Sequence, residues 1–369
     1  MEPTHHFKVI DHLRGVAILL VIANHTFGYA NVIPPMPFGY GNHLSLSNLI
    51  AFAFTHVFAN GFLGVMLFFV LSGFCIRWSH LNAGNFKWSD FYKRRFFRIF
   101  PAYWFWLVVT AILSGAGTRD FLYHTLLAHN LVKEYYHSIY PPFWSIAIEW
   151  QIYLIYPLLI IAASKVRQHI MLILLAGIGI ASSLISSGFI ASLIGTDVLG
   201  IIGRIPTAFL FSWMLGFYMA ESVKHGRRLD CSPRLLVLSL TVGVLFESYP
   251  NTCFLNSVPW TLAAYQTAAL FISNRHHRVF RMFDWLAWVG VISYSIYLSH
   301  DLFAFTYSYV ANFLNLTKGS VISGVSAAFV MIIPILLLGY ISFKLIEMPG
   351  IWIGKQLRSN LWNPKNQKP

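Results

Sequence analysis

The sequence predicts an all-α protein that crosses a membrane about ten times, with both termini on the cytoplasmic side. Only 11% of its 369 residues are charged, 57% are hydrophobic, and the mean hydropathy is +0.61. So few charged side chains cannot cover a water-soluble protein of this length. The formal net charge of +13 could suggest nucleic acid, but the basic residues fall in short clusters between apolar runs. We therefore expect no nucleic-acid partner, and the clusters indicate membrane topology.

Apolar runs of spanning length divide the chain. They lie at 7–29, 60–78, 99–116, 143–163, 170–188, 203–221, 235–250, 257–274, 285–313 and 320–343. The fifth and seventh runs are short, which leaves nine or eleven spans open. Asp11 and Arg14 interrupt the first run and no clean cleavage pattern follows it, so we expect a retained span rather than a secretory signal. The expected organisation is one transmembrane domain, 1–353, followed by a short polar cytoplasmic tail, 354–369.

Lysine and arginine orient these spans. If the N-terminus is cytoplasmic, only Arg119, Lys133 and Lys318 of the 26 Lys and Arg residues fall in outer loops, while Arg14 and Arg204 lie inside spans. All the others fall in inner segments, as the positive-inside rule requires.

The three cysteines are scattered without CxxC spacing, and no HExxH cluster is present. Neither pattern predicts a disulfide framework or a metal site, so we expect no bound metal.

The first run carries two ionisable side chains that are costly in hydrocarbon. Arg14 and His25 are eleven residues apart, which places them on nearly the same helix face, roughly 16 Å apart along the axis. A buried arginine costs about 2.5–3.5 kcal/mol on insertion scales, so this face must point into protein or a wet cavity. The alternative for Arg14 alone is a side chain that snorkels or caps a neighbouring helix. The pair indicates a functional site.

A basic cluster stands at the cytoplasmic mouth of the third run and contains Arg94, Arg95 and Arg98. Arg95 and Arg98 are three residues apart, so they share a helix face and present guanidinium forks suited to phosphate oxygens. The alternative is a membrane anchor that contacts anionic lipid.

The fourth run carries a carboxylate between two hydroxyls, because Ser145, Glu149 and Tyr153 follow i, i+4 spacing. We expect Glu149 to lie at the depth of His25 and to orient its imidazole. A structural hydrogen bond to a neighbouring helix is the alternative. In the ninth run Tyr297 and His300 are one turn apart, and we expect His300 to support catalysis or bind the acceptor rather than act directly.

Several of these motifs, taken in order, resemble the acyltransferase-3 membrane family. The residues that carry the resemblance are Asp11, Leu13-Arg14-Gly15, Ala17 and His25, then Phe68 to Phe74, Arg94-Arg95 with Arg98-Ile99 and Pro101, Trp144-Ser145 with Glu149, Gln151 and Tyr153, Ser293-Tyr294 with Tyr297-Leu298 and His300, and Glu347 with Pro349. The match runs across nearly the whole chain. His12, Trp150 and Asp301 depart from the family pattern, which affects the finer acceptor contacts.

The resemblance implies a ten-helix domain that transfers an acyl group, commonly acetyl, from cytoplasmic acyl-CoA to a hydroxyl, usually on a carbohydrate. It associates Arg14 and His25 with catalysis and Arg95 and Arg98 with the donor. The implied donor is acetyl-CoA, with no permanently bound cofactor. The implied acceptor is a cell-surface polysaccharide, lipopolysaccharide or other glycolipid. The expected location is the bacterial cytoplasmic (inner) membrane.

The residue patterns and the resemblance together lead us to expect that Arg94, Arg95 and Arg98 hold the donor. We expect His25 to act as general base, with Glu149 fixing the tautomer of His25. Asp11, Ser145, Tyr153, Tyr297 and His300 are expected at the acceptor or in support. Transfer through an acyl-histidine is left open. Some relatives carry an additional esterase-like domain, for which this chain has no room, so we expect direct transfer.

A different class of function is a proton-coupled transporter or flippase that uses the same Arg14, His25 and Glu149. It predicts inverted repeats and paired broken helices, which the sequence does not indicate.

Overall fold

The computed structural model describes residues 8–29, 46–186, 204–249, 252, 255–275, 282–306 and 321–360. All regular secondary structure in these residues is helical, which confirms the all-α prediction. Six helical segments of the described chain are long and apolar enough to cross a membrane: Lys8–Gly28, Phe52–Leu81, Trp88–Ser114, Phe143–Lys165, Gln168–Ile185 and Phe329–Leu357. The chain is therefore a polytopic membrane protein.

Most predicted runs coincide with helices to within a few residues. These helices are α1 (Lys8–Tyr29), α3 (Gly61–Leu81), α6 (Phe143–Lys165), α7 (Gln168–Ser186), α10 (Pro233–Ser248), α11 (Ser257–Ser273) and α16 (Val321–Ser342). Helix α9 (Leu210–Lys224) starts later than predicted, after the short 3-10 helix η4 (Pro206–Ala208). Helix α4 (Trp88–Ser114) starts earlier, so the basic cluster lies within its first turns.

Short helices fill the connections. Helix α2 (Leu46–Phe58) precedes α3, and α5 (Thr118–Thr125) with the 3-10 helices η1 (His129–Leu131) and η2 (Lys133–Tyr135) joins α4 to α6.

The predicted continuous span 285–313 is wrong within its described part. The chain forms α13 (Asp284–Val291), α14 (Ser293–Ser299) and the 3-10 helix η6 (His300–Thr306) instead. Hydrogen bonds to other helices hold α14: Tyr294 Oη donates to Ile99 O, and Ser295 Oγ donates to Glu347 Oε2. These bonds tie α14 to α4 and to the turn at Glu347.

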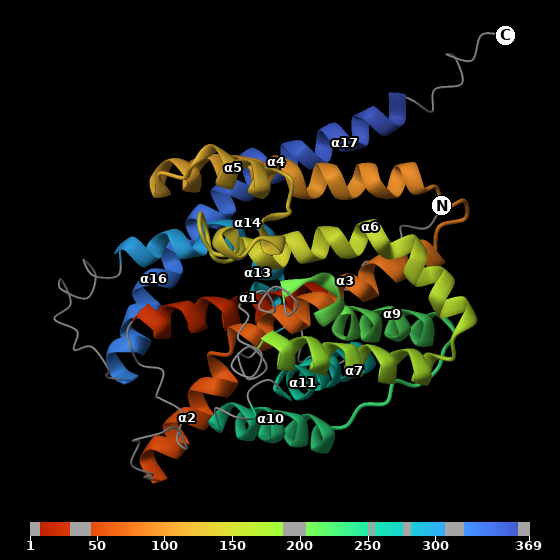
Figure 1. Cartoon of the computed structure of the whole chain (residues 1–369), viewed down its shortest axis with the longest axis horizontal. Coiled ribbons are helices and arrows are strands. Elements are labelled where there is room, and N and C mark those ends of the chain that lie inside the picture. The colour runs from red at the N-terminus through yellow and green to blue at the C-terminus, as the bar shows by residue number, and fades with distance from the viewer. Residues whose placement is uncertain are drawn as a thin grey trace.

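Helix α1 lies at the centre of the fold (Figure 1), where it packs against α3, α13, α14 and α16. Helices α9, α7, α10 and α11 lie on one side of it, and α4 and α5 on the other. After a π-helical turn, Phe343–Glu347, helix α17 (Met348–Asn360) packs along α4. The first part of the predicted polar tail is therefore helical.

Two glycines bring α1 and α13 into backbone contact. A Cβ at Gly290 would lie 1.7 Å from Asp11 O, and a Cβ at Gly15 would lie 2.2 Å from Leu286 O. Small residues at such crossings allow close packing where no hydrophobic effect drives helices together in lipid. This contact fixes the position of α1, which carries Arg14 and His25.

We expect Gly290→Ala to destabilise the protein by at least about 1–3 kcal/mol, because the added methyl overlaps the α1 backbone. The matched control is Gly177→Ala on α7, where a Cβ meets nothing within 4 Å. The midpoint of thermal unfolding in detergent, followed by size-exclusion chromatography, measures both variants. An unchanged midpoint for Gly290→Ala would contradict the close α1–α13 contact.

Candidate active site

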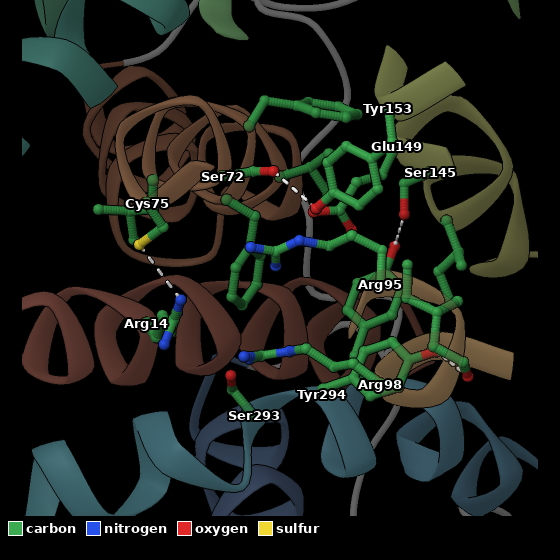
Figure 2. A pocket seen from close by; sticks show the side chains of 17 residues that line it. Arg14, Ser72, Cys75, Arg95, Arg98, Ser145, Glu149, Tyr153, Ser293 and Tyr294 are labelled. Atoms are coloured by element: carbon green, nitrogen blue, oxygen red, sulfur yellow. Dashed lines mark hydrogen bonds between the residues drawn. The ribbon is translucent and has the colours of Figure 1, made fainter. Parts of the chain in front are cut away.

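A polar cavity of about 880 Å³, its open mouth included, lies among α1, α3, α4, α6 and α14. Figure 2 shows arginine side chains from α1 and α4 projecting into it, opposite hydroxyls and a carboxylate from α3 and α6. Its labelled lining residues are Arg14, Ser72, Cys75, Arg95, Arg98, Ser145, Glu149, Tyr153, Ser293 and Tyr294. Polar groups of this kind inside a membrane domain indicate a binding site.

The cavity brings Arg14 of α1 together with Arg95 and Arg98 of α4. Arg14 forms an ion pair with Asp11, with Nη1 3.3 Å from Oδ1, and its Nη2 lies 3.4 Å from Cys75 Sγ. Arg95 and Arg98 enter from α4, as their spacing predicts. Three guanidinium groups in one cavity are suited to an anionic ligand with several phosphate oxygens.

Arg95 lies near two aromatic rings, and one of its nitrogens has no hydrogen-bond partner within the described residues. Its guanidinium carbon lies 5.6 Å from the ring centroid of Tyr153 and 5.8 Å from that of Phe91. Its buried Nε has no hydrogen-bond partner within the described structure. A buried donor of this kind costs free energy unless a ligand or water satisfies it. Arg94 is exposed and does not line the cavity, whereas Arg95 and Arg98 both do.

Glu149 lines the same cavity, and its predicted pairing with His25 is wrong. The Tyr153 hydroxyl, also 2.9 Å from Ser72 Oγ, donates to Glu149 Oε1. Glu149 also lies within electrostatic reach of Arg14. Because Arg14 and His25 are roughly 16 Å apart along α1, a carboxylate at the depth of Arg14 does not reach His25.

His25 is paired instead with Asp301 on η6, with Nδ1 2.9 Å from Oδ1. The ring of His300 meets His25 edge-on, at a centroid distance of 4.8 Å and an interplanar angle of 87°. The side chain of His25 is 29% exposed and does not line the cavity. Ligand atoms of His25, His300 and Asp301 lie within 4.8 Å of one another, close enough for a metal ion, a grouping that the sequence did not predict.

Ser145 and Tyr297 lie at the end of the cavity that is nearest to this histidine cluster. Their hydroxyls are 2.6 Å apart, and Tyr297 Oη donates to Pro142 O at 3.0 Å. The ring of Tyr297 is also 5.5 Å from that of His300. Tyr297 therefore contacts both the cavity and the histidine cluster.

Asp11, expected at the acceptor or in support, is buried beside Arg14 near the N-terminal end of α1. Sequence reasoning did not assign Ser72 or Cys75, although the resemblance included Ser72, and it named Asp301 only as an unusual neighbour of His300. The chain separation of His25 and Asp301 left no local spacing that could have paired them.

Comparison with known proteins agrees with this geometry. The family model of the acyltransferase domain (acyltransferase 3) matches residues 7–343. The chain belongs to the acyltransferase-3 family. The matched range includes every cavity residue and the His25–Asp301–His300 cluster, so this acyltransferase carries the whole candidate site within the family domain.

Three curated relatives were found. The peptidoglycan O-acetyltransferase OatA of Listeria monocytogenes is 27% identical over 79% of this chain, and the putative peptidoglycan O-acetyltransferase YrhL of Bacillus subtilis is 26% identical over 80%. The alignments span 48% and 49% of those two proteins, so this chain covers about half their length. An uncharacterized protein of Haemophilus influenzae is 24% identical over 58% of this chain and 99% of its own length. No solved structure matches.

We expect the double variant Arg95→Lys, Arg98→Lys to bind acyl-CoA about tenfold or more weakly, because lysine keeps the charge but loses the planar fork. Donor titration of purified protein in nanodiscs without anionic lipid measures this. Arg94→Lys is the matched control, since Arg94 lies outside the cavity lining. If the double variant binds acyl-CoA with wild-type affinity, the basic cluster serves only as a membrane anchor.

Proposed function

We propose that this acyltransferase is a membrane O-acetyltransferase of the bacterial cytoplasmic membrane. It moves an acetyl group from cytoplasmic acyl-CoA to a hydroxyl of a cell-surface or lipid-linked glycan. The observation that carries the proposal is the cavity that holds Arg14, Arg95 and Arg98 beside the helix of His25. Two relatives named as peptidoglycan O-acetyltransferases support a carbohydrate acceptor.

The donor enters from the side where α4 begins, which the distribution of lysine and arginine predicts to be cytoplasmic. Its phosphates bind Arg95 and Arg98, and the unpartnered Arg95 Nε supplies one donor for them. The pantetheine arm then runs past Arg14 and Cys75 toward Ser145 and Tyr297. The donor and the glycan thus approach the reacting carbonyl from opposite sides of the membrane.

The reaction exchanges one ester for another. The acceptor oxygen attacks the thioester carbonyl while His25 takes its proton, and the coenzyme A thiolate leaves and is protonated. A positioned general base contributes about 10²–10⁴-fold to such a step. A route through acyl-His25 uses the same groups and differs in that coenzyme A departs before the acceptor reacts.

The donor route is testable through Cys75, which lies beside Arg14 in the cavity. In a variant with Cys231→Ser and Cys253→Ser, we expect desulfo-coenzyme A, which has no thiol, to slow maleimide labelling of Cys75. At about ten times the Kd only about a tenth of the protein is free, so labelling slows about tenfold. Mass spectrometry measures the rate.

The control is a Cys75→Ser, Cys253→Ser variant labelled at Cys231, which lies outside the cavity and should be unaffected. Equal labelling of Cys75 with and without the ligand would place the donor elsewhere.

We expect His25→Ala to remain inserted and folded but to lose at least about 10²-fold in acetyl transfer, because its general base is gone. His169→Ala, an exposed histidine of α7, is the control. Mass analysis of glycans from cells expressing each variant measures the product, and acceptor-dependent release of coenzyme A measures the reaction in nanodiscs. Glycan movement without coenzyme A release would favour a transporter and sink the proposal.

A further inference from the structure

Burial and hydrogen bonding hold Asp301 in contact with His25. Asp301 Oδ1 lies 2.9 Å from His25 Nδ1, and the aspartate side chain is only 8% exposed. The backbone N–H of Asp301 donates to the hydroxyl of Tyr140 at 2.7 Å, and Tyr140 is itself buried. The backbone of Asp301 is therefore held by the segment before α6, independently of α1.

The hydrogen bond determines which tautomer His25 adopts. A carboxylate only accepts hydrogen bonds, so the proton of the neutral imidazole resides on Nδ1. The lone pair is then on Nε2, the atom that must take the proton of an acceptor hydroxyl. In serine proteases an aspartate holds the catalytic histidine in the same way, and its replacement by asparagine lowers kcat about 10⁴-fold.

His300 places a second, buried imidazole beside His25. Its Nδ1 donates to Tyr297 O at 2.9 Å, which leaves the lone pair on Nε2. That nitrogen is buried without a partner in the described part of the chain, and the residue is 3% exposed. A buried, unpaired nitrogen beside His25 is suited to accept a hydrogen bond from a hydroxyl of the acceptor.

We infer that Asp301 is the positioning residue of His25. It holds the imidazole with Nε2 facing the acceptor and stabilises the imidazolium that forms when the hydroxyl proton is taken. This inference rests on the proposed function and assigns to Asp301 the role that the sequence suggested for Glu149. Glu149 instead lies among the arginines of the cavity.

The test compares Asp301→Asn and Asp301→Glu with the wild type. Asparagine keeps the size but removes the charge, so we expect kcat to fall about 10²–10⁴-fold while the KM for acetyl-CoA changes less than about twofold. Asp301→Glu restores the carboxylate, so its kcat should be at least about tenfold higher than that of Asp301→Asn. Metal content and activity after chelation are measured on the same wild-type preparation.

The chain contains a matched control, Asp120→Asn. Asp120 Oδ1 lies 3.0 Å from Nδ1 of His124, so the variant removes the charge of another aspartate–histidine pair, in α5 outside the predicted spans. Burial lowers the pKa of His124, so this pair joins an aspartate to a neutral histidine, as proposed for His25. We expect the kcat of Asp120→Asn to stay near the wild-type value.

The outcomes are separable. A normal kcat in Asp301→Asn, or a rise in KM alone, would overturn the positioning role. A stoichiometric metal whose removal abolishes activity would make Asp301 a ligand and also overturn it. If Asp301→Asn does not fold, Tyr140→Phe provides the test. This variant keeps the carboxylate but removes the hydroxyl that accepts the backbone N–H of Asp301, and it must lower kcat at an unchanged KM. A wild type without acetyl transfer would instead refute the proposed function.

Discussion

The burial of three guanidinium groups inside a membrane domain constrains the rest of this structure. Each of Arg14, Arg95 and Arg98 would be strongly unfavourable in hydrocarbon, so helices from distant parts of the chain must enclose them in a polar cavity. Carboxylates balance them in part: Asp11 pairs with Arg14, and Glu347 lies within electrostatic reach of Arg98. Arg95 retains an Nε that is unsatisfied within the described residues, which favours ligand binding in this cavity.

Close helix packing places the arginine cavity and the histidine cluster along the same helix, α1. The glycine contact between α1 and α13 fixes α1, and the interruption between α13 and α14 allows η6 to place Asp301 and His300 beside the C-terminal part of α1. One helix therefore presents Arg14 to the arginine cavity and His25 to a separate cluster. This arrangement suits a transfer in which the two substrates approach from opposite sides.

The polar groups divide into an arginine set in the cavity and a histidine–aspartate set around His25, with different chemistry. The arginine set is cationic and suited to a phosphorylated ligand, whereas the other set combines two imidazoles with one carboxylate and is suited to moving a proton. Tyr297 contacts both, through Ser145 on the cavity side and His300 on the other.

The sequence by itself determined the all-α class, the positions of most helices, and the shared helix face of Arg95 and Arg98, because hydrophobic runs and helical spacing are local properties. It did not determine which residue pairs with His25, nor the break after α13. Spans that are apolar on all sides carry no signal for their rotation or depth relative to one another. Interhelical packing and hydrogen bonding decide these, so only the tertiary structure moved Glu149 to the arginines and brought Asp301 to His25.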